Sequence, residues 1–537
     1  MNRRLPVLLI ACLAALAALP TYASARKTQL SVIQDDAKVI ATDDGTRNAT
    51  LDEMRGLGAD VVKITVSWRD LANGGKPSNP DDPNAYPAAK WKPYDAAVQG
   101  AAARGLGVFL DISGPAPDWA VTKGSTPAGV YRPNAGEFGH FAKAVGTRYS
   151  GSFPIPAGTP APSTGGGGGG GNPQPCIVPP LCGTASNSAV ASLFGGGASA
   201  QPGARAAADT LPAVKLWSVW NEPNLPVFLL PQRSSTKSHY PVSPAIYRGL
   251  YRAAYAGLTG SGHAKDTILL GELLPVGKST KTPRSSIRPL EFLRELACVD
   301  RHFHAYKGSN AKARGCKGFK ALPLSGLAYH PYALAGGPTR RPPNRDDATI
   351  GTLSRVTKTI DRLRARGRLA GPKRLPLWLT EFGVQTDPPD YLFGAPLRRV
   401  PTYMGMSERI AVRNSRVYSY SQYPLVDDRT TSGFQSGLRF TSGKAKPGIY
   451  TEYRYPIFVT RSGRSAVHFF GGVRSADSGG SVVLFSRIGS KGKFTKLKTV
   501  KLGGRGYFEV RVRASSASKR QFKFGFGKAR SITVTAH

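Results

Sequence analysis

The feature that most constrains the fold of this chain is a regular alternation of strand and helix candidates between residues 30 and 455. Short runs of β-branched or other apolar residues alternate with amphipathic stretches of helical spacing, as in repeated βα units around a parallel sheet. The strand candidates begin near Leu30, Asp60, Gly107, Val214, Thr267, Gly326, Leu377 and Val417. Eight such units in series predict an α/β fold, a closed (β/α)8 TIM barrel.

Local signals place helices between these strands. Thr50 and Glu53 have the spacing of a capping box, so we expect a helix over residues 51–57. Further helices are expected over residues 94–104, which stop before Gly105, and over residues 137–149.

Two segments depart from the βα pattern. Residues 152–211 are rich in Pro, Gly, Ser and Ala, with unbroken glycine from 165 to 171, and such composition predicts a flexible insertion within a barrel domain of residues 26–455. After Tyr455 the helical spacing vanishes and short alternating runs appear, which predicts an all-β sandwich domain over residues 456–537.

The N-terminus has the layout of a secretory signal peptide over residues 1–25. Arg3 and Arg4 precede an apolar run from 5 to 20 and the small residues 23–25, so we expect a secreted, extracellular protein beginning near Arg26. An alternative is a lipid anchor at Cys12, because residues 9–12 resemble a lipobox. No later apolar run is long enough to predict a membrane span.

Four of the cysteines follow the predicted signal peptide, and an even number in an exported chain favours disulfides. The pairing expected from loop length and chain order is Cys176 with Cys182 and Cys298 with Cys316, although four cysteines allow three connectivities. No spacing typical of a zinc site occurs, so the sequence predicts no metal.

The chain is strongly basic, with 73 Lys and Arg against 33 Asp and Glu and a net charge of +40. From Tyr455 onward the only acids are Asp477 and Glu509. This region is either a solvated basic surface or a surface that adheres to an anionic cell-envelope polymer or acidic glycan. Nucleic acid is not expected as a partner, because the chain has an export signal and no recognised nucleic-acid motif.

Two glutamates stand at predicted strand ends, where barrel active sites are built. The fourth strand runs into Asn221, Glu222 and Pro223, and the seventh runs into Glu381, Phe382 and Gly383. Both carboxylates should point into the same mouth. Glycosidic cleavage needs such a pair, one to protonate the leaving oxygen and one to meet the oxocarbenium-like carbon.

These two motifs, in this order, resemble the clan A glycoside hydrolases, families 5 and 39 in particular, over about residues 30–455. The resemblance implies a retaining hydrolase in which Glu222 is the acid/base and Glu381 the nucleophile. It also implies that Asn221 binds the sugar 2-hydroxyl. His330 and Tyr332 match the clan's His-x-Tyr motif, which implies that Tyr332 orients the nucleophile while His330 lines a substrate subsite.

Aromatic residues near strand ends are further candidates for sugar contacts. Trp119 and Tyr423 are expected to form walls of the substrate site, because sugar rings stack on flat apolar surfaces. Glu272, at the end of the fifth strand, is either a substrate contact or a structural carboxylate. The second strand carries Lys63 where family 5 commonly has an arginine near the nucleophile, so the family's substrate specificity is not carried over.

The sequence therefore predicts a retaining glycoside hydrolase that acts on β-linked polysaccharide or oligosaccharide and needs no cofactor. A non-catalytic carbohydrate-binding or cell-wall-binding protein is one alternative. A transglycosylase is another, because it would use the same covalent intermediate.

Overall fold

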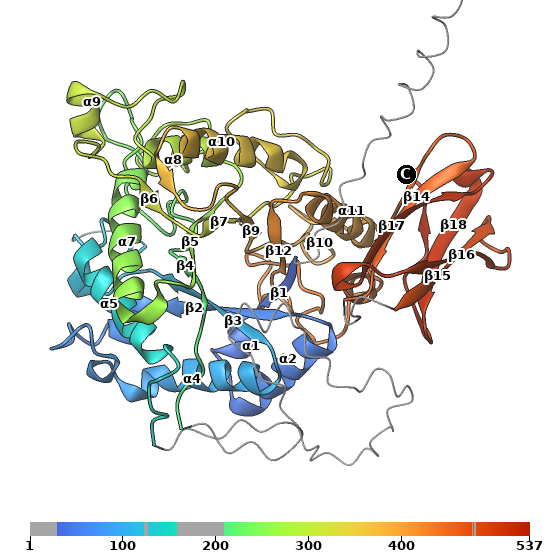
Figure 1. Ribbon diagram of the computed structural model, residues 1–537, viewed down its shortest axis with the longest axis horizontal. Coiled ribbons are helices and arrows are strands. Elements are labelled where there is room, and N and C mark those ends of the chain that lie inside the picture. Colours follow the sequence, from blue (N-terminus) through green and yellow to red (C-terminus); the bar gives the residue numbers. More distant parts are fainter. Residues whose placement is uncertain (1–28, 123–126, 158–208, 475, 477–479) are drawn as a thin grey trace, which may run out of the picture.

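A computed structural model describes residues 29–122, 127–157, 209–474, 476 and 480–537. Its centre is a closed barrel of eight parallel strands in the order β1-β12-β9-β7-β5-β4-β3-β2 (Figure 1). These strands are β1 (Leu30–Gln34), β2 (Val61–Ser67), β3 (Gly107–Ser113), β4 (Leu216–Val219), β5 (Thr267–Leu273), β7 (Gly326–Tyr329), β9 (Leu377–Leu379) and β12 (Val417–Gln422). Each begins at the predicted residue or one or two residues later, so the predicted barrel is confirmed.

Helices flank the barrel, as the βα pattern requires (Figure 1). They are α1 (Asp36–Val39), α2 (Asp44–Gly56), α3 (Trp68–Ala72), α4 (Ala88–Ala103), α5 (Ala135–Arg148), α7 (Ser243–Leu258), α8 (Pro289–Leu296), α9 (Gly308–Ala313), α10 (Leu353–Ala365), α11 (Val400–Arg413) and α12 (Ile449–Arg454). Helices α5 and α7 pack closely together, because a side chain at Gly257 would collide with the backbone of Gly139. Among the described residues, no helix has the length and apolarity needed to cross a membrane.

The predicted start of the second helix is wrong. Helix α2 begins at Asp44, because the side chain of Asp43 accepts a hydrogen bond from the backbone N–H of Thr46 and caps the helix there. Thr50 lies inside the helix, and its hydroxyl donates to the carbonyl of Thr46 at 2.7 Å. A capping box can therefore be mimicked by residues in mid-helix, and Asp43 was the stronger cap.

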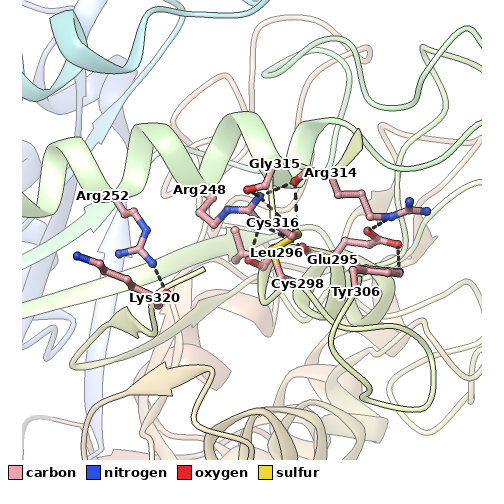
Figure 2. The surroundings of a disulfide bond; sticks show 10 residues. All are labelled: Arg248, Arg252, Glu295, Leu296, Cys298, Tyr306, Arg314, Gly315, Cys316 and Lys320. Atoms are coloured by element: carbon pink, nitrogen blue, oxygen red, sulfur yellow. Dashed lines mark hydrogen bonds and ion pairs between the residues drawn. A yellow bond between two sulfur atoms is a disulfide. The ribbon is translucent and has the colours of Figure 1, made fainter. Parts of the chain in front are cut away.

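Parts of the predicted insertion and disulfides lie outside the described residues. At the ends of the insertion, Pro154 and Thr210 form an antiparallel bridge, so the chain leaves and re-enters the barrel at neighbouring points. Cys176 and Cys182 fall in the part that is not described, as does the predicted signal peptide. The other predicted pair is confirmed, because Cys298 and Cys316 form a disulfide that links the region after α8 to the end of α9 (Figure 2).

The region after Tyr455 consists of antiparallel sheets. One contains β13 (Ile457–Arg461), β14 (Ala466–Gly472) and β17 (Tyr507–Arg513). The other contains β16 (Thr495–Lys501), β15 (Ser481–Ile488), β18 (Arg520–Phe526) and β19 (Ala529–Arg530), with β20 (Val534–Thr535) paired to β18. Side chains of both sheets share one hydrophobic cluster, in which Phe508 meets Phe524 edge to face at 5.4 Å between ring centroids.

This C-terminal region is joined to the barrel through buried polar contacts. Arg474 donates to Ser31 on β1 at 2.9 Å and pairs with Glu408 of α11 at 2.7 Å. Arg505 pairs with Asp60, which directly precedes β2, also at 2.7 Å. Because Ser31 and Asp60 lie at the starts of their strands, the C-terminal region contacts the barrel at the end opposite the predicted site.

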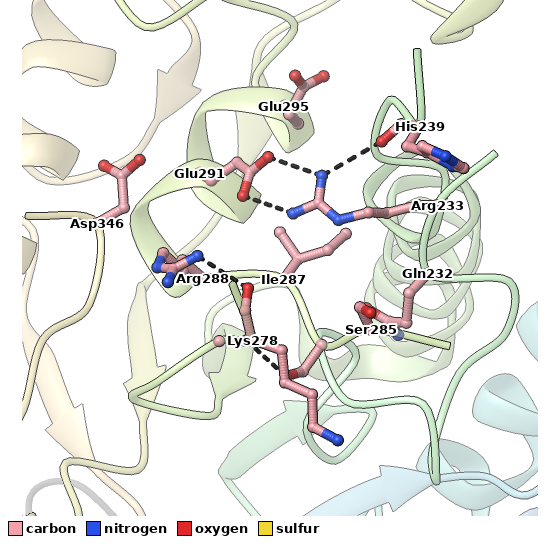
Figure 3. A network of polar contacts seen from close by, with 12 residues as sticks. Gln232, Arg233, His239, Lys278, Ser285, Ile287, Arg288, Glu291, Glu295 and Asp346 are labelled. Carbon is pink, nitrogen blue, oxygen red and sulfur yellow. Dashed lines mark hydrogen bonds and ion pairs between the residues drawn. The ribbon is translucent and has the colours of Figure 1, made fainter. Parts of the chain in front are cut away.

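At the other end, the loops after β4 and β5 are tied to helix α8. Arg233, from the first loop, forms a two-pronged pair with Glu291 of α8 at 2.8 and 3.0 Å (Figure 3). Arg288, which precedes α8, donates to the carbonyl of Lys278 in the second loop at 2.9 Å (Figure 3). These contacts hold one side of the barrel mouth. The short strands β10 (Thr386–Asp387) and β11 (Ala395–Pro396) follow β9 at this end, whereas β6 (Leu322–Pro323) and β8 (Leu369–Ala370) precede β7 and β9 at the opposite end.

Candidate active site

The backbone adopts an uncommon conformation where β4 ends. Trp220 has φ of 68° and Glu222 has φ of 37°, both in the left-handed region that side chains other than glycine rarely occupy. Such residues cost roughly 1–3 kcal/mol each and persist where the surrounding structure holds them. The indole N–H of Trp220 donates to the carbonyl of Phe228 at 3.1 Å, and the backbone N–H of Asn221 donates to the hydroxyl of Ser113 at 2.8 Å. The turn therefore fixes the direction in which Glu222 leaves the strand.

Glu222 and Glu381 converge on one nitrogen atom. His330, directly after β7, has its Nδ1 at 2.9 Å from Oε1 of Glu222 and at 3.2 Å from Oε2 of Glu381. The two carboxylate oxygens are therefore separated by no more than the sum of these distances. Only 7% of Glu222 and 6% of Glu381 is exposed, which places them at the floor of the mouth.

Tyr332 is the second group that contacts Glu381. Its hydroxyl donates to Oε1 of Glu381 at 2.7 Å, so each oxygen of that carboxylate has a partner in the protein. The tyrosine ring stacks between Phe382 and Phe434, at 6.2 and 5.8 Å between centroids. These rings hold the hydroxyl, and through it the orientation of the carboxylate.

A second polar layer lies inside the barrel beneath His330. Nε2 of His330 faces Oε2 of Glu272 at 3.2 Å, and Lys63 of β2 pairs with the same oxygen at 2.5 Å. The other oxygen of Glu272 accepts from the hydroxyl of Ser218 at 2.9 Å. Ser218 also contacts Asp111 of β3 at 3.1 Å. The sequence left Glu272 as either a substrate contact or a structural carboxylate. Because Glu272 has no exposed surface, the structure favours the structural role.

Burial and neighbouring charges together set the pKa values of Glu272, His330 and Asp111. Burial raises the pKa of Glu272, but Lys63 and His330 outweigh it and lower that pKa to about 2. Burial lowers the pKa of His330, but the charge of Glu381 and the hydrogen bonds to Glu222 and Glu272 raise it to about 10. Asp111 has a pKa of about 8, raised by burial and by the charge of Glu272.

The pKa of Glu222 is raised. Its largest cause is burial, and the nearby charges of Glu381 and Glu272 act in the same direction, while His330 opposes them. A carboxyl group with a raised pKa keeps its proton closer to neutral pH, as a general acid must.

The predicted sugar-contacting residues differ in exposure and in contacts. Asn221 and Tyr423 are partly exposed, and Tyr423 meets Phe434 edge to face at 4.9 Å between centroids. Trp119, in the loop after β3, is partly buried, and its indole N–H donates to the carbonyl of Ala72 at 2.9 Å. His330 is fully buried beneath the two glutamates, so the only route by which it affects a ligand is through them.

The sequence predicted Glu222, Glu381, His330 and Tyr332 as site residues, but it did not predict the polar layer beneath His330. A signal was present, because Lys63, Asp111 and Glu272 are charged residues within otherwise apolar strands. Such residues face either the barrel interior or the layer of helices around it, and the eight-strand register decides between the two. Among the described residues there is no group of three or more His, Cys, Asp or Glu arranged to hold a metal ion.

A scan against protein-family models finds no match for this chain, and a search of the curated proteins finds none either.

Proposed function

We propose that this protein is a secreted retaining glycoside hydrolase of the clan A type, with Glu222 as acid/base and Glu381 as nucleophile. The observation that carries the proposal is the convergence of both carboxylates on Nδ1 of His330. The sum of the two distances is an upper limit for the separation of these two oxygens, and it accommodates the roughly 5–5.5 Å between the carboxyl groups of retaining enzymes.

The proposed reaction has two displacement steps. In the first, a carboxylate oxygen of Glu381 bonds to the anomeric carbon, the bond to the leaving oxygen breaks, and that oxygen takes the proton of Glu222. In the second, a water gives a proton to Glu222, its oxygen bonds to the anomeric carbon, and the ester to Glu381 breaks. Glu222 regains its proton and Glu381 its charge.

The surrounding residues have supporting roles in this proposal. Tyr332 holds one oxygen of Glu381 by a hydrogen bond. Which of the two oxygens attacks would depend on how the substrate approaches. Asn221 is placed beside Glu222, where it would bind the sugar 2-hydroxyl, and Trp119 and Tyr423 would form walls for β-linked sugars.

The C-terminal sheets are proposed to form a basic β-sandwich that holds the enzyme near an anionic cell-envelope polymer. Edge strand β16 carries the exposed Lys496, Lys498 and Lys501. Lysines also protect edge strands from pairing with other chains, and that role needs no partner. Binding to an immobilised anionic polymer that falls steeply with salt, and is lost when all three are replaced by Gln, would favour adhesion.

Assays on aryl β-glycosides and β-linked polysaccharides test the hydrolase proposal. Turnover with retained anomeric configuration is expected, together with a covalent glycosyl ester at Glu381 when a slow 2-fluoro glycoside is used. Binding of a glycan without turnover would instead indicate a carbohydrate-binding protein. Transfer of the glycosyl group to an added sugar in preference to water would indicate a transglycosylase.

A further inference from the structure

His330 is surrounded by carboxylates at both of its ring nitrogens. Nδ1 faces Glu222 and Glu381, at 2.9 and 3.2 Å, and Nε2 faces Glu272 at 3.2 Å. A neutral imidazole has one donor and one acceptor, whereas an ionised carboxylate can only accept. Both nitrogens can therefore satisfy these partners together only when the ring carries two protons, unless a carboxyl proton points at the ring.

The far side of the ring is anchored by a buried ion pair. Glu272 lies between Nε2 of His330 and Nζ of Lys63, and neither Glu272 nor Lys63 is more than 1% exposed at its side chain. Glu272 is also held by Ser218, whose hydroxyl contacts Asp111. The ionisable groups that face His330 thus come from five barrel elements. They are Lys63 on β2, Asp111 on β3, Glu222 after β4, Glu272 on β5 and Glu381 after β9, with the Tyr332 ring edge-on at 6.4 Å.

We propose that His330 is a positioning residue that stays doubly protonated and shifts its Nδ1–H between Glu381 and Glu222 as negative charge moves between them, with Glu272 and Lys63 holding the ring in place. This inference rests on the proposed function. In the free enzyme the charge is on Glu381 and the proton on Glu222. In the glycosyl-enzyme Glu381 is a neutral ester and Glu222 is the carboxylate.

Charge balance explains why one proton donor serves both states. Each state has a single negative charge on the Glu222 and Glu381 pair. Nδ1 hydrogen-bonds Oε1 of Glu222 at 2.9 Å and lies 3.2 Å from Oε2 of Glu381. The ring need only turn slightly, so little reorganisation accompanies each step. No proton leaves His330 in either step, and the proton balance of the two displacements is unchanged. The raised pKa of His330 is consistent with a ring that keeps both protons.

The decisive variant is Glu272→Gln, which removes the anionic anchor at Nε2 and preserves side-chain size. We expect kcat to fall about tenfold to a hundredfold with little change in KM, because substrate contacts stay and the ring is held less well. The alkaline limb of the kcat profile should move to lower pH. Asp111→Asn is the comparison variant: it alters a buried carboxyl that hydrogen-bonds Ser218 and makes no hydrogen bond to the ring, so it should lower kcat less than Glu272→Gln does.

Glu272→Gln leaves Lys63 without its partner and can fail to fold, so a second variant combines it with Lys63→Met, which removes both charges together. Enzyme with ¹⁵N-labelled histidine provides a direct readout, with the signal of His330 assigned by loss in His330→Gln. Both ring nitrogens of His330 should be protonated at pH 8 in the unmodified enzyme. The midpoint of deprotonation should fall by about one unit or more in either variant that lacks Glu272.

A neutral His330 ring at pH 8 in the unmodified enzyme would overturn the inference, as would an unchanged midpoint and unchanged kcat in the Glu272 variants. The nuclear magnetic resonance readout needs no substrate. If no glycan is turned over but His330 is doubly protonated and responds to Glu272, the proposed function fails while the charge state assigned to the ring is upheld. If glycans are hydrolysed and the ring is neutral, the proposed function stands and the charge state assigned to the ring is wrong.

Discussion

The barrel has a buried ionic cluster near each end, and the two differ in charge balance. We call Lys63, Glu222, Glu272, His330 and Glu381 the mouth cluster. The base cluster consists of Arg474, Glu408, Tyr507, Tyr453 and Ser31. In the base cluster the guanidinium of Arg474 contacts Glu408, Ser31 and the carbonyl of Tyr453, and the hydroxyl of Tyr507 donates to Glu408. The one cation is paired directly with one carboxylate and with neutral groups, and the pKa of the neighbouring buried Glu452 is raised well above its usual value by burial and by the charge of Glu408.

The mouth cluster gathers three glutamates around two cations. The charges of Glu381 and Glu272 raise the pKa of Glu222, so the excess is relieved when that residue keeps a proton. Two of its carboxylates are also slightly exposed, whereas the Arg474 and Glu408 side chains are 2% and 3% exposed. An ionic cluster that only joins two parts can be balanced and sealed. A cluster that exchanges protons and contacts a ligand needs a group whose shifted pKa lets it gain and lose a proton, and it needs access to solvent.

The largest expected effect is the loss of catalysis when the mouth cluster loses its proposed nucleophile. Glu381→Gln should lower kcat by more than about a thousandfold, because the amide cannot form the glycosyl ester. The free energy of unfolding of this variant should change little, since the amide oxygen of Gln can still accept the hydrogen bond from Tyr332. Steady-state rates on an aryl β-glycoside give the measurement. A rate near that of the unmodified enzyme would remove Glu381 from this role.

The base cluster should respond in the opposite way. Arg474→Met leaves Glu408 buried without its cation, which should lower the free energy of unfolding by about 3–5 kcal/mol. Turnover per folded molecule should be unchanged. Unfolding in guanidinium chloride measures the first quantity, and Arg409→Met is the control, because its pair with Glu509 is more exposed and should contribute less than about 1 kcal/mol. If both variants lost the same free energy of unfolding, the base cluster would contribute no more to stability than the exposed pair does.

Most of the barrel could be predicted because each strand has its own local signal. The runs beginning at Gly107 and Thr267 are long and apolar, and the structure starts β3 and β5 at those residues. The start of α2 could not be fixed in the same way. Asp43 and Thr50 are both capping residue types, and the choice between them depends on the packing of the whole helix.

The candidate site also contains residues that the sequence could predict and residues that it could not. Glu222 and Glu381 lie at strand ends, where topology alone brings them to one mouth, so they could be named from sequence. The partners of Lys63 could not, because residues 63 and 272 are far apart in the chain and meet through barrel closure and strand register. The burial of His330 depends on side-chain packing, which the His-x-Tyr spacing does not encode.

A smaller effect should separate the support of Glu381 from its chemistry. Tyr332→Phe removes a single hydrogen bond to a charged group, worth roughly 1.5–3 kcal/mol, and should lower kcat by about ten- to a hundredfold. The ring stacking with Phe382 and Phe434 should persist, so the fold is expected to be retained. Unchanged kcat would mean that His330 alone orients the carboxylate. Tyr423→Phe keeps the ring and serves as the control.

The last prediction is a pH slope of stability that belongs to the mouth cluster. His330 has a folded pKa of about 10, above the roughly 6.5 of an unfolded chain, so the folded state binds the extra proton between these values. Its stabilisation should be complete below about pH 6.5 and be lost as the pH rises toward 10, with a slope of at most about 1.4 kcal/mol per pH unit. Guanidinium chloride unfolding at pH 6.5, 8 and 10 measures this slope. His330→Gln should flatten it, whereas Arg474→Met should lower stability and leave the His330 contribution in place. If both variants changed the slope alike, the two clusters would not differ in the way their charges indicate.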